Sequence, residues 1–278
     1  MRRIKRPTVS ALEALSLCIE SIRDAGLSQR LKFVAATIEE TESAYVSHGE
    51  KSTLYTVAGT NGVAGKVTTD EMERVYAQTF VKSARTRHIY DSIKKIPEND
   101  ICPLCGQRTV STLDHYLPKS AHPALAVTCL NLVPACSDCN KTKLAFQAVT
   151  AGDQTLHPYF DDVDDERWLF AKVQESSPAA LIFMTEPPAA WTEIKRQRIG
   201  AHFRTFALAK LYASHSAVEL NNIRFGLQEM AKRCPPSEIS AHLRQEAISR
   251  AAAHTNSWQR ATYEALADSE WYCSGGFN

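Results

Sequence analysis

The sequence has no long apolar run and no strong excess of charge of either sign. None of its 278 residues falls in a stretch of about 18 consecutive apolar residues, so a membrane-spanning helix is not expected. The basic start, residues 1–6, precedes an apolar stretch that Glu13 and Glu20 interrupt, which predicts an amphipathic helix and not a signal peptide. The net charge of +1 means that any polyanionic ligand must be attracted by local basic patches and not by the net field.

A nucleotide-binding phosphate loop is also absent. The glycine-rich segment 59–67 contains Gly65-Lys66, but Thr60 stands where the first glycine of such a loop is required. Val67 stands where a Ser or Thr would hold magnesium. The segment is therefore interpreted as a connection between helices.

The eight cysteines are unevenly distributed, and four of them form two CxxC pairs. Thirty residues separate the pairs, a spacing typical of a structural zinc site with four thiolate ligands. Because no export signal is recognised, metal binding is favoured over disulfide formation, and a cytoplasmic location is expected. The predicted zinc ligands are Cys102, Cys105, Cys136 and Cys139.

Polar residues with different chemistry lie between and directly after these pairs. Asp114-His115 lies between the pairs, and Asn140 follows the last cysteine. Four thiolates already fill a tetrahedral site, so these three residues indicate a second function. Carboxylate and amide oxygens suit Mg²⁺, whereas an imidazole that titrates near neutrality suits a general base. If residues 113–117 form a strand, Asp114 and His115 leave it on opposite faces.

The order CPLCG, LDHYLPKS and LNLVPACSDCNKTK resembles the HNH endonuclease family over about 45 of the 278 residues. The resemblance implies two strands and a helix around one catalytic Mg²⁺ or Mn²⁺, with the cysteines matching a zinc-containing subset. It implies that His115 is the general base and that Asp114 and Asn140 are metal ligands. Many relatives have a second histidine at the Asn140 position. The resemblance further implies that Asn131 pins the loop between the strands and that Lys143 contacts phosphate.

A strongly basic stretch, residues 82–95, precedes the first cysteine pair. Its position favours contact with a nucleic acid, although a solvated helix face would have the same composition. Other basic residues flank the Asp-His and the last cysteine pair. The candidate DNA-binding residues are Lys82, Arg85, Arg87, Lys119 and Lys141.

The expected fold is α+β and mostly helical. Residues 1–98 are predicted to form a helical N-terminal region, with capping signals at Ser10 and Thr68. Residues 99–165 are predicted to form the ββα-metal core with its four-cysteine zinc site. Residues 166–278 are predicted to form a strand pair, 168–173 with 180–185, followed by two long helical segments that Pro235-Pro236 separates.

Three further segments resemble a narrower group, the nuclease subunits of bacterial Septu anti-phage defence systems. They are Arg2-Arg-Ile-Lys-Arg-Pro7, Arg87-His-Ile-Tyr-Asp91 and His157-Pro-Tyr-Phe-Asp161. This resemblance implies DNA cleavage by an effector with an ATPase partner, and a homodimer would supply two active sites. Two alternatives stay open: a non-catalytic zinc-dependent nucleic-acid-binding module, and an effector that cleaves RNA or tRNA at the same site.

Overall fold

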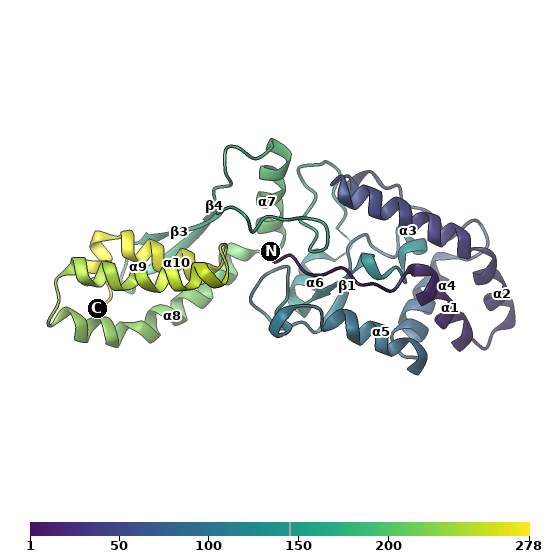
Figure 1. The fold of residues 1–278 in the computed structure, drawn as a ribbon, viewed down its shortest axis with the longest axis horizontal. Coiled ribbons are helices and arrows are strands. Elements are labelled where there is room, and N and C mark those ends of the chain that lie inside the picture. Colours follow the sequence, from purple (N-terminus) through teal and green to yellow (C-terminus); the bar gives the residue numbers. More distant parts are fainter. Residues whose placement is uncertain (145) are drawn as a thin grey trace. The chain divides into compact units, whose positions relative to one another are not determined.

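Two compact units make up the chain, Met1–Asp162 and Val163–Asn278. The computed structural model describes residues 1–144 and 146–278 (Figure 1). Both units are mixed α+β and mostly helical, and each contains a two-stranded antiparallel sheet, which confirms the expected class. The predicted division at residue 98 falls inside the first unit, and the predicted division at 165 lies close to the observed one.

Helices of the first unit begin at side-chain caps that are visible in the sequence. The Ser10 side chain accepts the Glu13 N–H, and Thr68 and Glu71 form a reciprocal capping box, as predicted. Asp24 caps the next helix by accepting the Leu27 N–H. The helices are α1 (Ala11–Ser21), α2 (Ala25–Phe33), α3 (Ala35–Glu50), α4 (Thr69–Arg74) and α5 (Ala84–Lys94), with a π-helical segment, η2 (Val75–Phe80), between the last two.

The apolar faces of these helices form the core on which the first strand pair lies. Leu15 of α1, Ile38 of α3 and Ile93 of α5 are buried in one cluster. Leu113 and Leu132, one from each strand, belong to the same cluster. The N-terminal helices therefore supply the apolar support for the segment that contains the cysteine pairs.

The central segment has the predicted order of strand, strand and helix. Strand β1 (Thr112–His115) pairs antiparallel with β2 (Leu132–Ala135), and α6 (Ser137–Lys143) follows directly. The register places Asp114 opposite Val133 and His115 opposite Leu132. Short 3₁₀ turns, η4 (Pro123–Leu125) and η5 (Cys129–Asn131), lie in the loop between the strands.

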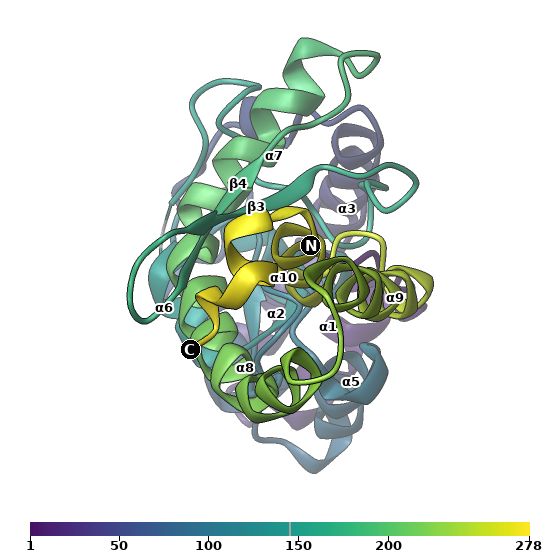
Figure 2. The ribbon, with the colours of Figure 1, turned by 90° about the vertical axis from the view of Figure 1, so that its left-hand side faces the viewer.

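The second unit contains the predicted strand pair, β3 (Leu169–Gln174) and β4 (Ala180–Thr185). Helix α8 packs against β4 and α10 against β3, so both lie on the strand pair (Figure 2). None of the helices within the described residues is long and apolar enough to cross a membrane. The helices are α7 (Glu193–Thr205), α8 (Leu208–Ala231), α9 (Pro236–Ala253) and α10 (Trp258–Asp268), and a π-helical turn, η6 (Tyr272–Gly276), follows.

The prediction of two long helical segments after residue 191 was wrong, because two further breaks occur. Ala207 separates α7 from α8 with a left-handed backbone, φ 49° and ψ 41°, at a position with no glycine or proline to signal a break. Ser257 caps α10 by accepting the Arg260 N–H and so separates it from α9. The break at Pro235-Pro236 was predicted correctly.

Candidate functional site

The four cysteines of the two CxxC pairs form one buried cluster. Their sulfur atoms all lie within 4.8 Å of one another. Tetrahedral coordination with Zn–S bonds of about 2.3 Å requires sulfur atoms roughly 3.8 Å apart, so a small movement of these side chains would complete such a site. The cluster can therefore hold a metal ion such as zinc.

Local backbone geometry positions both cysteine pairs. In the first pair, the Cys102 N–H donates to the Arg108 carbonyl at 2.7 Å, and the turn between them passes through Gly106 with φ +64°. In the second, Cys136 is the N-cap of α6 and its sulfur accepts the Cys139 N–H at 3.4 Å. The Arg108 N–H likewise donates to the Cys105 sulfur at 3.4 Å. These N–H···S contacts favour thiolates, the form that binds metal.

A cavity of about 410 Å³ adjoins β1 and the middle and C-terminal end of α6. It brings together Asp114 and His115 of β1 with Asn140 of α6, residues that are well separated in the sequence. Two of the predicted DNA-binding residues, Lys119 and Lys141, lie on its wall. The other lining residues are Tyr76, Thr112, Leu113, Pro118, Ser120 and Leu144.

His115 is buried and its ring is held from two sides. Its Nε2 lies 2.9 Å from the Ala126 carbonyl oxygen, which can only accept, so Nε2 carries the proton and Nδ1 keeps its lone pair. The Tyr76 ring meets the imidazole edge-on, with centroids 4.4 Å apart. Burial is the main reason that the pKa of His115 falls to about 3, so the ring is neutral at physiological pH.

Asp114 leaves the opposite face of β1 and meets α6. Lys143 Nζ lies 3.1 Å from Asp114 Oδ2 and donates to the His115 carbonyl at 2.7 Å. Burial raises the pKa of Asp114, and the Lys143 ammonium opposes this shift. The sequence placed Lys143 at the phosphate, but its side chain is only 3% exposed and does not line the cavity. In this structure Lys143 holds the carboxylate and the strand.

Asn131 is fully buried and ties together both ends of the loop between the strands. Its Oδ1 accepts the Leu117 N–H at 2.8 Å, and its Nδ2 donates to the Leu117 carbonyl at 3.0 Å and to the Leu125 carbonyl at 3.3 Å. The side-chain amide thus replaces a backbone partner at the exit of β1. Because His115 lies two residues before Leu117, these bonds also fix the end of the strand that carries it.

The remaining basic candidates have partners outside the cavity. Lys82 donates to Gln78 at 2.9 Å, Arg85 pairs with Glu20 at 3.1 Å, and Arg87 pairs with Asp91 at 3.0 Å. They lie on α5 or just before it, and none lines the cavity. Lys119, on the wall, pairs with Glu73 at 2.9 Å. Lys141 is exposed on α6.

Sequence reasoning missed Tyr76 and the Ala126 carbonyl, both of which hold His115. Tyr76 follows the same helical spacing as the core residues Met72 and Phe80, so its pattern predicts packing alone. The residue lies in the π-helical segment η2, and π-helical turns are frequent at functional sites. Periodicity calculated for an α-helix contains no signal for such a segment.

Two other sequence features have structural roles. The His157 ring is buried, accepts the Tyr159 N–H on Nδ1 at 3.2 Å, and meets the Tyr45 hydroxyl at 2.9 Å through Nε2. It is a packing residue. The glycine-rich loop forms a bridge between Val63 and Val67, with positive φ at Gly62 and Gly65, and so is a tight turn.

No protein-family model matches the chain, and no solved structure matches it. A protein called Protein ea31, from Escherichia phage lambda, is 25% identical to it over an alignment of 295 residues. The alignment covers 99% of this chain and 100% of ea31, so the similarity extends over both compact units.

Proposed function

We propose that the protein is a metal-dependent endonuclease of the HNH type that hydrolyses DNA phosphodiester bonds. The observation that supports this most is the cavity where Asp114, His115 and Asn140 converge at the junction of β1 and α6. Hydrolysis of a phosphodiester needs a base for water, charge stabilisation at the phosphoryl oxygens, and room for both. The cavity offers an imidazole, oxygen donors and two lysines around one space.

The two proposed metals have different ligands and different functions. Zinc would be held by Cys102, Cys105, Cys136 and Cys139 and would stabilise the fold of the segment. Mg²⁺ or Mn²⁺ would be held by oxygens of Asp114 and Asn140, a donor set that fits a hard cation which keeps several waters. When bound, this ion would stabilise developing charge on the phosphoryl group.

The Lys143 ammonium bears on how tightly the second metal could bind. It lies 3.1 Å from Asp114 Oδ2 and leaves the other carboxylate oxygen for a cation. The negative charge of Asp114 is then largely balanced by Lys143 at the proposed metal site. The phosphates of the substrate would supply the further negative charge that attracts the metal ion. We therefore expect weak metal binding by the free protein and tighter binding with nucleic acid.

His115 is the proposed general base, and its surroundings fix the tautomer that this function needs. The Ala126 carbonyl keeps the proton on Nε2, which leaves the Nδ1 lone pair to take a proton from water. Tyr76 and the burial of the ring limit its rotation. Lys119 and Lys141 on the wall would attract the phosphate backbone.

The cellular role is proposed from the resemblance to Septu nuclease subunits. In this proposal the protein acts in the cytoplasm as an anti-phage effector, an ATPase partner controls it, and a homodimer supplies two active sites for duplex cleavage. The first unit contains the cleavage site, which leaves the second unit available for partner binding.

Plasmid cleavage tests the nuclease proposal directly. Wild type and a His115→Ala variant are incubated with supercoiled plasmid in Mg²⁺ or in EDTA, alone and, if the neighbouring genes encode an ATPase, together with it. We expect cleavage by wild type in Mg²⁺ only, and a loss of at least a hundredfold in the variant. His242→Ala, which changes an exposed histidine on α9, is the matched control and should cleave normally.

Other substrates separate the alternatives. Single-stranded DNA and tRNA are offered in parallel, and preferential cleavage of tRNA would identify an RNA-cleaving effector. Nucleic-acid binding with no cleavage under any of these conditions would contradict the nuclease proposal and favour the zinc-dependent binding module. Equal cleavage by wild type and His115→Ala would contradict the assignment of the base.

A further inference from the structure

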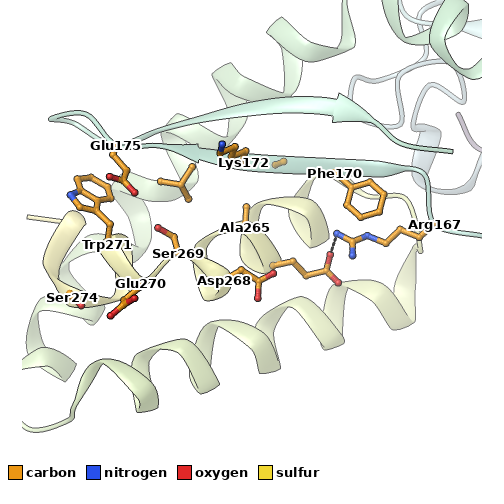
Figure 3. A pocket seen from close by; sticks show the side chains of 13 residues that line it. Arg167, Phe170, Lys172, Glu175, Ala265, Asp268, Ser269, Glu270, Trp271 and Ser274 are labelled. Atoms are coloured by element: carbon orange, nitrogen blue, oxygen red, sulfur yellow. Dashed lines mark ion pairs between the residues drawn. The ribbon is translucent and has the colours of Figure 1, made fainter. Parts of the chain in front are cut away.

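The second unit contains a groove of about 700 Å³ that none of the sequence motifs accounts for. One wall is strand β3, and the other is formed by the end of α10 and the residues that follow it (Figure 3). From β3 and its flanks come Arg167, Phe170, Ala171, Lys172, Val173 and Glu175. From the opposite wall come Glu264, Ala265, Asp268, Ser269, Glu270, Trp271 and Ser274.

The groove runs along the backbone edge of β3. Phe170, Ala171, Lys172 and Val173 are consecutive and all line it. Consecutive strand residues point to alternate faces, so one face of the strand could not present all four. The strand pair has only two members, and β4 lies on one edge of β3. The other edge is therefore the one that opens into the groove.

The pairing pattern shows which backbone groups this edge presents. The Glu186 N–H donates to the Trp168 carbonyl at 2.8 Å, and hydrogen-bonded pairs in an antiparallel ladder recur at every second residue. Residues 168, 170, 172 and 174 therefore bond to β4, whereas Ala171 and Val173 direct their N–H and C=O groups outward. Within the described residues, no hydrogen bond from these groups to another element is found.

The groove is lined by carboxylates near Trp271, and Lys172 lies farther along β3 (Figure 3). Arg167 is paired with Glu264, and Asp268 is paired with Arg244. Glu175 and Glu270 have no ion-pair partner among the described residues. In Figure 3 the Glu175 side chain lies beside the Trp271 ring, and Glu270 points to the other side of the turn. The structure thus places an uncompensated carboxylate next to an indole ring, a combination that attracts a cationic side chain.

Trp271 is held in place before any ligand binds. A Cβ atom added at Gly276 would lie 2.4 Å from the indole ring, so the ring lies directly against the backbone of this glycine. Only glycine leaves room for that contact. An aromatic side chain that is already oriented loses little conformational entropy on binding.

We propose that this groove binds an extended, lysine- or arginine-containing segment of a partner protein as an additional strand on β3. The segment would pair its backbone with the outward N–H and C=O groups of Ala171 and Val173. One of its cationic side chains would lie against Trp271, beside Glu175. This inference does not depend on the proposed nuclease activity, because every group it uses belongs to the second unit.

Peptide binding to the full-length protein tests the proposal. The probe is a fluorescein-labelled seven-residue peptide of alternating threonine and lysine, and binding is followed by fluorescence anisotropy up to millimolar concentration. A peptide of alternating threonine and glutamate is the charge control. We expect saturable binding of the lysine peptide, and binding of the glutamate peptide at least tenfold weaker.

Protein variants identify the surface involved. Ala171→Pro removes an outward N–H and leaves the bonds between β3 and β4 intact, so it should weaken binding about tenfold, whereas Ala171→Ser should not. The double change Glu175→Gln with Glu270→Gln should weaken it about as much, with Glu166→Gln, outside the groove, as control. This pair of tests stands even if Ala171→Pro fails to fold.

Two results would overturn the proposal. One is the absence of lysine-peptide binding at millimolar concentration. The other is binding that neither the carboxylate changes nor a folded Ala171→Pro variant weakens, because the peptide would then occupy another surface.

Discussion

The two units bury their polar groups in different ways. In the first unit, Asp114, His115, Asn131 and Lys143 are buried together around one short strand pair. In the second unit, the strand pair is covered by long helices and its buried centre includes Trp168, Phe183 and Tyr212. Burying polar or charged groups costs free energy unless each has a partner. The first unit satisfies these groups with specific hydrogen bonds and adds a four-cysteine cluster, whereas the buried Arg198 and His202 of the second unit lie on α7 and not on its strand pair.

This difference bears on why the candidate site lies in the first unit. A strand pair of four residues per strand cannot bury enough apolar surface to fix a cavity by itself. Asn131, the cysteine cluster and the N-terminal helices together hold its backbone. This support keeps Asp114 and His115 at the cavity, although burying these polar side chains does not itself stabilise the fold.

The largest expected effect is loss of the metal cluster. Cys136→Ser should abolish zinc binding and destabilise the first unit by more than about 5 kcal/mol, because a structural zinc contributes its binding free energy to folding. Metal analysis and calorimetry would show lost zinc and a lower melting temperature for one transition only. Cys234→Ser, outside the cluster, should change neither quantity. A Cys136→Ser variant with full zinc and full stability would contradict the zinc assignment.

The converse change in the second unit is Trp168→Ala. Trp168 is 1% exposed and its Nε1–H donates to the Val163 carbonyl at 2.9 Å. Removing it should destabilise the second unit by about 4 kcal/mol through lost packing, although the Val163 carbonyl keeps the hydrogen bond from Asn256 Nδ2. Zinc content should stay at the wild-type level. A simultaneous loss of zinc would show that the two units do not fold independently.

Asn131→Ala should destabilise the first unit by about 3 kcal/mol. The change leaves the Leu117 N–H and carbonyl buried without the Asn131 amide, whereas the Leu125 carbonyl keeps the Thr128 N–H. Urea unfolding monitored by a first-unit probe would measure the loss. Asn222→Ala, on the exposed face of α8, is the matched control and should stay within about 0.5 kcal/mol of wild type. Equal effects of the two changes would show that Asn131 does not fix the loop.

The smallest expected effect concerns pH. The two hydrogen bonds from Arg30 are the main reason that the pKa of Glu71 falls to about 2, and the Thr68 N–H adds to it. A lowered folded-state pKa stabilises the fold above pH 4.5 and loses this contribution as pH falls toward 2. Glu71→Gln should therefore cost about 1 kcal/mol at pH 7, reduced by solvent screening, and progressively less below pH 4.5.

The matched control for this pH effect is Glu40→Gln, which changes an exposed carboxylate on α3. Stability is measured by urea unfolding at several pH values between 3 and 7. A cost of Glu71→Gln that does not depend on pH would show that its ion pair does not contribute as described.

Local signals in the sequence were sufficient to predict several elements of both units. The CxxC pairs indicated one cluster, the caps at Ser10 and Thr68 indicated helix starts, and alternation indicated the strand pair of the second unit. The caps and the alternation depend on residues a few positions apart. The cysteine cluster follows from the four ligands that a zinc ion requires, which does not depend on the rest of the fold. The break at Ala207 could not be predicted, because tertiary packing imposes a left-handed backbone on a residue that favours helix.

The sequence by itself determined the chemistry available to this protein: four thiolates, an Asp-His dipeptide, and asparagines at set spacings. Only the tertiary structure decided how these groups are used. It buried Lys143 against Asp114 and not at the cavity, oriented His115 through the Ala126 carbonyl and Tyr76, and opened the edge of β3 to a groove. The physical reason is that burial, ionisation and hydrogen-bond partners depend on atoms far apart in the chain, which no spacing rule contains.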